Sequence, residues 1–445
     1  MTASCGDGTP APSDADAARA NPSAAAAPNE WSMFGQGPGR TNFNPGETTL
    51  SAATLPRLSP AWAFDVGTSG DPTSSGPVVA AGRVYVGSSV AFGDNYFALD
   101  AATGQLVWSA DLGHGSDNST NPCGSVGLGS TAAVASGVLV VGGGDSAYYA
   151  LDAATGAVLW RHALGLDPYG FAWTSPLVAG GRAYVGVASA CVDPARGELR
   201  ALDMATGALV ANQFFVPPGA DGASVWNSAT LSPDGAVVYV ATGNDKGTHG
   251  AYEQAVVSLD AQTLAILQAD KRGPTDLDLD FVSTPITFSD AGGRPLLGAS
   301  HKTGVFYAYL ASNLSAGPIW SRTVGAVIGL APAYDPGVGN GGTLFFGGTD
   351  DQGRQQVRAV DPATGADRWP PVTLNKIHGN LAAANGLLFV NAGTPGLHVF
   401  DERTGALLRV LVPSAPGRSY SGVAVAQGTV YWLSGSVLNA WRLPI

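Results

Sequence analysis

Short apolar runs separated by turn-forming residues fill most of the chain, and one pattern of apolar and polar positions recurs through them. It reads ALDAATGQLVW at residues 98–108 and ALDAATGAVLW at 150–160. Diverged copies are ALDMATGALV (201–210), SLDAQTLAIL (258–267), AYLASNLSAGPIW (308–320), AVDPATGADRW (359–369), VFDERTGALLR (399–409) and the half-copy LNAWRL (438–443). This recurrence predicts a protein built from structural repeats.

Each part of the pattern favours a β-hairpin. The apolar pair ends one strand, the Asp side chain accepts backbone N–H groups of the turn, and the Gly supplies a positive φ. The apolar run that follows, often ending on Trp, forms a second strand. A lone hairpin of this length cannot bury both of its faces, so the copies must stack against one another.

A second hairpin precedes each copy, as in SSGPVVAAGRVYVGS (74–88) and TSPLVAGGRAYVGV (174–187). One repeat therefore has four short strands, and the repeats follow one another about every 50 residues. Eight units predict an all-β fold, an eight-bladed β-propeller of four-stranded antiparallel blades over residues 29–445. The last unit lacks its outer strand. LSPAWAFDVG (58–67) has the character of that strand, so we expect it to close the ring.

Composition is compatible with a large β-sheet core and excludes several functions. Hydrophobic residues make up 45% of the chain and charged residues only 13%, and the net charge is −12. An acidic chain of this kind argues against binding to nucleic acid or to anionic membrane surfaces. No apolar run approaches the roughly 18 residues of a transmembrane helix.

Two motif-like patterns are better explained as loops. Gly337, Gly339 and Gly342 match the spacing of a dinucleotide-binding loop, but a strand follows them where a helix is needed, so we expect a hairpin loop. Asp276, Asp278 and Asp280 match the start of a calcium-binding EF-hand loop, but the Gly and Glu that the loop requires are missing.

The repeat and the opening WSMFGQGPGRTNFNPGET (31–48) resemble the pyrroloquinoline quinone (PQQ) propeller superfamily, near its polyvinyl-alcohol-dehydrogenase-like branch. The resemblance covers about residues 31–445 and supports the eight-bladed fold. The superfamily also includes outer-membrane assembly lipoproteins that bind no quinone, so it determines the activity far less closely than the fold.

The resemblance implies a site at the propeller axis. SVWNSATLSPDGAVVYVATGN (224–244) is similar to the segment that carries a Trp floor and a calcium ligand, which implies Trp226 and Asn244 in these roles. DLDF (278–281) resembles the segment of the catalytic base, which implies Asp280 as base and second metal ligand. ASHKTGVFYAYL (299–310) implies Lys302 as the cation that contacts the quinone.

These four residues form a coherent set for alcohol oxidation. A flat indole suits a planar quinone, a carboxylate takes the alcohol proton, and calcium with an ammonium polarises the accepting carbonyl. Each residue also has a plain structural interpretation. Trp226 could pack between blades, Asn244 could be a turn residue, Asp280 could lie on a solvated strand end, and Lys302 could be a hairpin-tip cation.

The chain departs from the implied site at two points. VGVASACVDPARG (185–197) is similar to the stretch that should hold a Glu ligand, and Cys191 stands near that place, with Glu198 further along. A thiol is a poor ligand for calcium, which prefers oxygen. GLGSTAAVASG (127–137) has no Arg to bind a quinone carboxylate. The resemblance also brings Cys123 and Cys191 toward the axis, and we expect a disulfide between them if the protein is extracytoplasmic.

The N-terminus gives a hypothesis about location. Ala3-Ser4-Cys5 resembles the end of a bacterial lipobox, although no export signal precedes it in this sequence. We interpret Cys5 as a lipid-acceptor cysteine at the end of a disordered tether (residues 1–28); the alternative is an incidental cysteine. The sequence thus favours an extracytoplasmic, bacterial, monomeric protein that is at most lipid-anchored.

The preferred function is a PQQ- and calcium-dependent dehydrogenase that oxidises a small or polymeric alcohol and passes electrons to an external acceptor. The alternative is a non-catalytic binding or assembly propeller with a protein partner. Another enzyme activity on the same fold is a third possibility, because a fold does not determine its chemistry.

Overall fold

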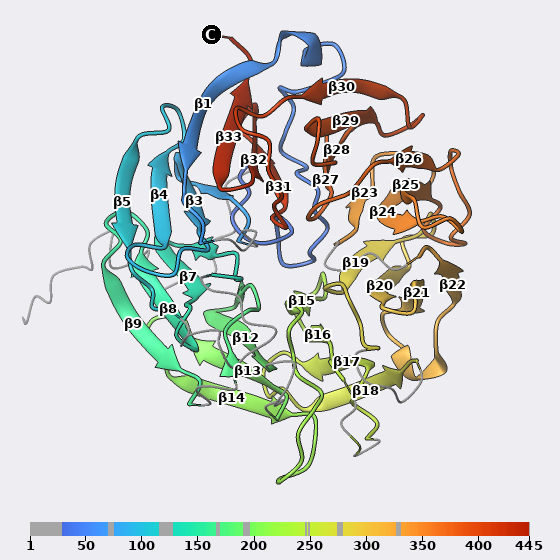
Figure 1. The fold of residues 1–445 in the computed structure, drawn as a ribbon. Helices are drawn as coiled ribbons and strands as arrows, with labels where there is room; N and C mark the ends of the chain where they lie inside the picture. The colour runs from blue at the N-terminus through green and yellow to red at the C-terminus, as the bar shows by residue number, and fades with distance from the viewer. Residues whose placement is uncertain are drawn as a thin grey trace, which may run out of the picture.

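The structure, a computed structural model, describes residues 29–69, 75–114, 128–165, 170–189, 196–244, 247, 250–273, 279–325 and 331–444. In these residues the strands form eight antiparallel sheets, arranged as blades around a central axis (Figure 1). The predicted eight-bladed all-β propeller is therefore confirmed. We number the blades 1 to 8 in chain order, from the sheet of β2 to the sheet of β31.

Each blade has four main strands, and their order from the axis outward follows the chain in blades 1 to 7. In blade 8 the outermost strand is the N-terminal β1, and the sheet of blade 3 also includes the short strand β10. The innermost strands are β2 (Val78–Ala80), β6 (Ala133–Ala135), β11 (Leu177–Ala179), β15 (Thr230–Leu231), β19 (Ile286–Ser289), β23 (Ala333–Asp335), β27 (Ala382–Ala384) and β31 (Val423–Ala426). The second strands are β3 (Arg83–Gly87), β7 (Val138–Gly142), β12 (Arg182–Ser189), β16 (Val237–Ala241), β20 (Pro295–His301), β24 (Thr343–Thr349), β28 (Leu387–Asn391) and β32 (Thr429–Ser434).

The third strands carry the apolar pair and the Asp of the repeat. They are β4 (Tyr96–Asp100), β8 (Ala147–Asp152), β13 (Glu198–Asp203), β17 (Ala255–Asp260), β21 (Val305–Leu310), β25 (Gln355–Val360), β29 (Leu397–Asp401) and β33 (Val437–Arg442). The outer strands are β5 (Leu106–Ala110), β9 (Val158–Ala163), β14 (Leu209–Phe214), β18 (Ile266–Lys271), β22 (Trp320–Thr323), β26 (Val372–Leu374), β30 (Leu407–Leu411) and β1 (Ser59–Asp65). The remaining elements are β10 (Gly170–Phe171) and the 3-10 turns η1 (Leu55–Arg57) and η3 (Leu314–Ala316).

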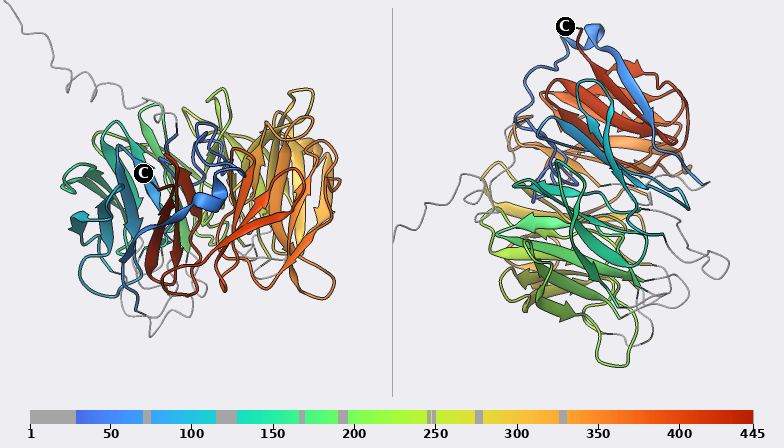
Figure 2. Two further views of the ribbon diagram at one scale, coloured as in Figure 1. Left: turned by 90° about the horizontal axis from the view of Figure 1, so that it is seen from above. Right: turned by 90° about the vertical axis from the view of Figure 1, so that its left-hand side faces the viewer.

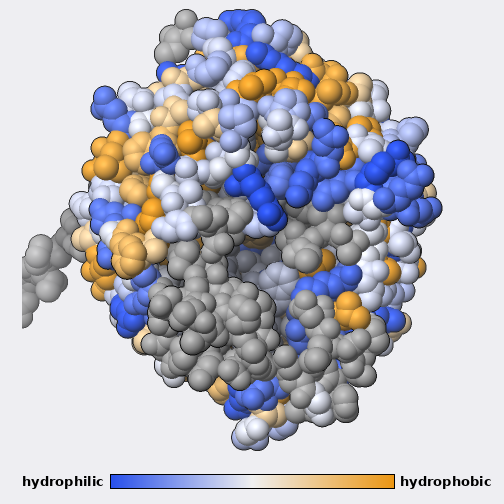
Figure 3. Space-filling view, in the orientation of Figure 1, coloured by the Kyte–Doolittle hydropathy of each residue, from blue (hydrophilic) through white to orange (hydrophobic). Residues whose placement is uncertain are grey.

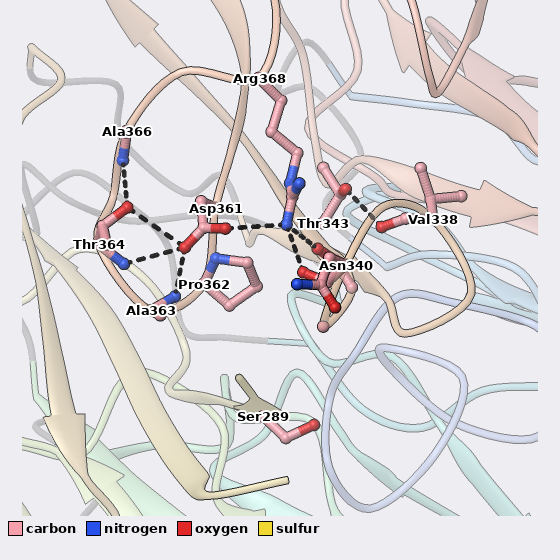
Figure 4. A network of polar contacts seen from close by, with 12 residues as sticks. Ser289, Val338, Asn340, Thr343, Asp361, Pro362, Ala363, Thr364, Ala366 and Arg368 are labelled. Carbon is pink, nitrogen blue, oxygen red and sulfur yellow. Dashed lines mark hydrogen bonds and ion pairs between the residues drawn. The ribbon is translucent and has the colours of Figure 1, made fainter. Parts of the chain in front are cut away.

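The Asp of the repeat shapes the turn between the third and outer strands, as predicted. In blade 6, Asp361 Oδ1 accepts hydrogen bonds from Ala363 N (2.9 Å), Thr364 N (3.2 Å) and the Thr364 hydroxyl (3.2 Å) (Figure 4). Thr364 Oγ1 in turn accepts from Ala366 N at 3.3 Å. Gly365 follows with φ +70°, a conformation that favours glycine. One carboxylate therefore satisfies the donors of an otherwise open turn.

The Trp of one blade contacts the turn of the next. Trp108 Nε1 in blade 1 donates to Ala153 O in blade 2 at 3.1 Å, and Trp160 makes the same bond to Met204 O at 3.0 Å. The indole of Trp108 also lies against the turn glycine of blade 2, because a Cβ on Gly156 would be only 2.7 Å from the ring. The Trp and the Gly of the repeat thus form one inter-blade contact, in which glycine is required by both φ and space.

Blade 4 departs from this contact on both sides. Its turn has Leu264 in place of the glycine, with φ +58°, and the preceding blade has Ala211 where blades 1 and 2 have Trp108 and Trp160. Leu264 is fully buried and packs in the same apolar cluster as Ala211. A larger side chain at the turn therefore occupies space that the missing indole leaves, at the cost of a strained backbone.

An N-terminal strand closes the ring, as predicted from the sequence. β1 pairs with β33 in antiparallel register, with Trp62 opposite Ala440 and Phe64 opposite Leu438. Figure 2 shows the blue β1 beside the red strands of blade 8. Trp62 Nε1 donates to Ala101 O of blade 1 at 3.1 Å, so the borrowed strand also supplies the inter-blade contact. Pairing removes an exposed strand edge.

Residues 29–50, which we call the axial segment, cross the centre of the ring and bond to the inner part of every blade. Their backbone pairs with the innermost strands of blades 1, 2, 4, 5, 6 and 7, through Val79, Val134, Leu231, Thr287, Tyr334 and Ala383. The side chain of Arg40 reaches blade 3, and Asn44 Nδ2 donates to Val425 O of blade 8 at 2.7 Å. Figure 1 shows this blue segment at the centre of the ring.

Arg40 is the most deeply buried charge of the axial segment, with no exposed surface. Its guanidinium donates only to backbone carbonyls: Ala229 O (2.9 Å), Phe34 O (2.6 Å), Pro176 O (3.1 Å) and Ser175 O (3.3 Å). Burial lowers the pKa of Arg40 to about 9, so the side chain is still charged at neutral pH. One cation therefore joins the axial segment to blades 3 and 4.

Glu402 is an unusual residue in the repeat. It follows the turn Asp of blade 7, where other blades have Ala101, Ala153, Met204 and Pro362, and its side chain is buried. Burial raises the pKa of Glu402 well above its usual range, and the nearby Asp335 of blade 6 raises it further. Two carboxyl groups thus face each other at the interface between blades 6 and 7.

Arg40→Met should destabilise the protein. The change removes four hydrogen bonds and leaves buried carbonyls without donors, each at about 1–3 kcal/mol, partly offset because no cation is buried. We expect a net loss of about 2–4 kcal/mol in urea unfolding. Arg57→Met, at an exposed position in η1, should change stability by less than about 0.5 kcal/mol. Equal stability of the two variants would contradict the role of Arg40.

Glu402→Gln should change how stability depends on pH. Because the folded-state pKa of Glu402 lies above its unfolded-state value, the folded protein binds more protons between the two, and stability falls as the pH rises from about 4.3. The variant lacks this titration, so its free energy of unfolding should fall less between about pH 4 and 8. Equal slopes in Glu402→Gln and the parent would reject the assignment.

Candidate active site at the propeller axis

A cavity of about 510 Å³ opens at the axis, within the size range of small-molecule sites. Figure 3 shows a hollow near the middle of this face. Loops that precede the innermost strands provide most of its wall, and Phe34 of the axial segment lies in it as well. Two half-buried indoles, Trp173 and Trp226, line the cavity, and Trp173 stacks on Phe171 with ring centroids 4.8 Å apart.

Three of the four residues implied by the resemblance meet at the edge of this cavity. Trp226 Nε1 donates to Asp280 Oδ2 at 2.9 Å, and Lys302 Nζ lies 2.6 Å from Asp280 Oδ1. The ammonium also lies 5.3 Å from the centroid of the Trp226 ring, in cation–π range. Asp280 is only 2% exposed, and its charge is balanced by Lys302.

The backbone of blade 5 holds Asp280 and Lys302 together. Lys302 lies in the turn between β20 and β21, and its N–H donates to Asp280 O at 2.9 Å. Phe281 and His301 form the adjoining antiparallel bridge, with their rings edge-on at 5.0 Å. Burial, with a smaller effect from Lys302, lowers the pKa of His301 to about 4, so this imidazole is neutral beneath the ion pair at neutral pH.

The chain at Asn244 runs next to Asp280. A Cβ on Gly243 would lie 2.6 Å from Ser224 Oγ and 3.3 Å from Asp280 Oδ2, so only glycine permits this approach. Gln254, fully buried with φ +51°, links the two segments: its N–H donates to Gly243 O at 2.9 Å and its Nε2 to Leu279 O at 2.6 Å. One residue therefore fixes, through its backbone and its side chain, the residues that precede Asn244 and Asp280.

The donor atoms near Asp280 suit a hard cation. Asn244 Oδ1 is buried and has no hydrogen-bond partner among the residues that the structure describes, although a buried amide oxygen normally has one. Amide and carboxylate oxygens are the ligands that calcium prefers. No group of three or more His, Cys, Asp or Glu side chains is arranged to hold a metal within the described residues. Asn244 and Asp280 thus fit part of a calcium shell, and the flat wall of Trp226 fits a planar cofactor.

Several predicted residues lie elsewhere or outside the described residues. Glu198 begins β13, where it is buried and pairs with Arg200 at 2.9 Å, and it is not among the described residues of the cavity wall. Gly337, Gly339 and Gly342 lie in the hairpin between β23 and β24, as expected. The residues outside the described part of the chain are Cys5, Cys123, Cys191, Asp276 and Asp278, so the lipid-anchor and disulfide hypotheses stay predictions.

Sequence analysis missed much of the cavity wall. Trp173, Lys376, His378 and Arg418 line the cavity but belong to no motif that we recognised. Their shared signal is positional, because each lies in a loop that leads into an innermost strand. Comparing these loops across the repeats would have identified them as candidates.

A family model described as outer membrane protein assembly factor BamB matches residues 59–244, 98–352 and 353–437. These matches cover most of the propeller. The chain belongs to the PQQ-type β-propeller superfamily. The resemblance noted in the sequence is therefore confirmed at the level of the family, which includes both dehydrogenases and assembly proteins.

Dehydrogenases are among the relatives. A polyvinylalcohol dehydrogenase of Pseudomonas sp. is 25% identical over 77% of this chain and 59% of its own length. A quinohemoprotein alcohol dehydrogenase of Comamonas testosteroni is 25% identical over 96% of this chain and 61% of its own length. The chain thus spans about three fifths of the length of both relatives.

The solved structure of the quinohemoprotein alcohol dehydrogenase from Comamonas testosteroni superimposes with a TM-score of 0.77. The match covers 97% of this chain and 82% of that one at 18% identity, which establishes the shared fold. Within the described residues, no helix has the length and apolarity to cross a membrane.

A double-mutant cycle should measure the contact between Asp280 and Lys302. Lys302→Met removes the ammonium beside a buried carboxylate and should lower stability by about 3 kcal/mol. The Asp280→Asn/Lys302→Met double variant should lose at least about 1 kcal/mol less than the sum of the single variants in urea unfolding. The more exposed pair Arg354 and Asp350 should couple by less than about 1 kcal/mol. Additive losses at Asp280 and Lys302 would show that the pair does not interact.

Proposed function

We propose that this chain is a quinoprotein-type dehydrogenase that oxidises an alcohol in the axial cavity. The observation that carries the proposal is the arrangement of Trp226, Asp280 and Lys302 at the cavity edge. A buried carboxylate that contacts both a cation and an indole is costly to a fold and is typical of functional sites. The dehydrogenases among the relatives support the same choice of activity.

Asp280 would act as the base. Oδ1 faces the Lys302 ammonium and Oδ2 accepts a hydrogen bond from Trp226, and an ionised carboxylate at this place can take the proton of a substrate hydroxyl. Val282 and Ser283 line the cavity two and three residues further along, so the base lies next to the substrate space. Proton uptake at Asp280 would free the Lys302 charge to stabilise negative charge that develops nearby.

Trp226 and Asn244 would hold the cofactor and its metal. Pyrroloquinoline quinone, when bound, supplies the two-electron acceptor for the hydride that leaves the alcohol carbon. Trp226 would offer a flat face for stacking, and the unpartnered Asn244 Oδ1 would join Asp280 in binding calcium. Turnover also needs an external electron acceptor. We further infer an extracytoplasmic, monomeric protein, as the sequence suggested.

The second candidate is a non-catalytic binding or assembly propeller. The observation in its favour is the match to the family model described as outer membrane protein assembly factor BamB. In that case the Asp280–Lys302 pair would serve packing, and the axial cavity would accept a partner segment in place of a cofactor. The two functions differ in what the cavity binds, which an experiment can separate.

The wild-type protein with excess calcium should bind PQQ in calorimetry and oxidise alcohols with a dye as acceptor. Asp280→Asn should keep PQQ binding and lose about 10²–10⁴-fold in kcat, because the base is gone. Trp226→Ala should weaken PQQ binding, because the stacking face is gone. Asp234→Asn, in the turn between β15 and β16, should match the wild type. Absence of PQQ binding by the wild-type protein would reject the enzyme and favour the binding propeller.

A further inference from the structure

The charge of the axial cavity is opposite to that of the chain. The protein has a net charge of −12, yet Lys376, His378 and Arg418 line the cavity and no Asp or Glu does so among the described residues. Figure 3 shows strongly hydrophilic residues beside the central hollow, on the side of blades 7 and 8. In a chain with more acids than bases, a wall of this kind favours an anionic ligand.

Two neighbouring blades supply the cations. Lys376 lies in the loop that joins β26 of blade 6 to β27 of blade 7. Arg418 lies in the corresponding loop, which leads into β31 of blade 8. Neither side chain makes an ion pair within the described residues, whereas Lys302 and eight of the arginines do. The Arg418 guanidinium lies 4.7 Å from the centroid of the Tyr420 ring, which holds it at the cavity wall.

His378 shows that both cations act on one place. Burial lowers the pKa of His378, and the charges of Lys376 and Arg418 lower it further, so the imidazole is neutral at neutral pH. It can therefore give a hydrogen bond between the two cations without adding a third positive charge. An ammonium, a guanidinium and a neutral imidazole together suit a carboxylate, which accepts several hydrogen bonds at once.

This wall and the candidate base lie on different blades of the ring. Lys376 and Arg418 belong to blades 7 and 8, while Trp226 and Asp280 belong to blade 4 and the start of blade 5 (Figure 1). A ligand with its hydroxyl at Asp280 and an anionic group at Lys376 and Arg418 would extend from one set of blades to the other. A ligand that contacts both places therefore needs a hydroxyl at one end and an anionic group at the other.

We propose that the alcohol oxidised here carries a carboxylate, which Lys376 and Arg418 bind while the hydroxyl lies at Asp280. The inference rests on the proposed function and names its substrate class: a hydroxy acid with its two groups at opposite ends. PQQ also carries carboxylates, and these could be the anions that the wall binds. The experiment therefore measures substrate and cofactor binding separately.

The first test compares ω-hydroxy acids of increasing length, from 4-hydroxybutanoate to 8-hydroxyoctanoate, with diols of equal length. With PQQ and calcium at saturation, the wild-type protein should have a higher kcat/KM for the acid at one chain length. Lys376→Ala and Arg418→Ala should each lower the acid-to-diol ratio of kcat/KM about tenfold, mainly through KM. Lys376→Glu should reverse the preference toward the matching amino alcohol. The exposed Arg57→Ala should keep the wild-type ratio.

The second test separates substrate from cofactor by calorimetry. The dissociation constant for PQQ should change less than about twofold in Lys376→Ala and Arg418→Ala, and direct binding of the preferred hydroxy acid to the loaded Asp280→Asn protein should be lost with either change. Weaker PQQ binding with an unchanged acid-to-diol ratio would overturn the proposal in favour of a cofactor-binding wall. An unchanged ratio with unchanged PQQ binding would overturn it outright.

Failure of the proposed function gives a different result. If the wild-type protein binds no PQQ, the dehydrogenase is rejected, but hydroxy acid and diol can still be titrated into it. Acid binding that requires Lys376 and Arg418 would then support a carboxylate site in a binding propeller. Absence of acid binding in that case would reject the carboxylate site as well.

Discussion

The buried guanidinium of Arg40 imposes the constraint on which the rest of the propeller depends. It has no counter-ion among its contacts and is satisfied by carbonyls of Phe34, Ser175, Pro176 and Ala229. Such a charge is tolerated only where all of these carbonyls are held in place, because partial satisfaction would leave a desolvated cation. The position of the axial segment and the spacing of the blades it touches are therefore determined together.

The same segment gives the two ends of the axis different properties. At one end, residues 29–50 fill the space between the innermost strands and satisfy their free backbone groups. At the other end, the loops that lead into those strands surround an open cavity with Phe34 in its wall. A ring of nearly equivalent blades thus acquires one closed face and one open face, and the chain can place different chemistry on each blade around the opening.

Sequence reasoning succeeded where the chemistry is local. The turn at Asp361 uses groups within a few residues, so the repeat alone predicted the hairpins, and counting them predicted the blades and the closing strand. It failed where partners are distant: Arg40 binds a carbonyl 189 residues away, and a carbonyl acceptor leaves no mark in the sequence. Ala211 stands in place of the repeat's Trp and Leu264 in place of its Gly. These two replacements could be related to each other only when the structure showed that they pack together between adjacent blades.

The candidate site was predictable in the same uneven way. Resemblance to a family indicated Trp226, Asp280 and Lys302, which the fold brings together. The hydrogen bond from Gln254 to Leu279 O could not be predicted, because the two residues are 25 positions apart and belong to no shared motif. Lys376 and Arg418 were missed because each appears alone in its own loop. Their meaning depends on the ring, which places neighbouring loops side by side and makes one wall from two isolated charges.

The pairing of β1 with β33 has a consequence for the order of assembly. Chain synthesis produces residues 59–65 long before residues 437–442, so the first blade-forming strand has no partner in its sheet until β33 has been made. During that interval β1 presents an unpaired edge, the kind of surface that promotes aggregation and that chaperones bind. The ring can therefore be finished only after translation of the last blade, and any nascent intermediate is an open arc.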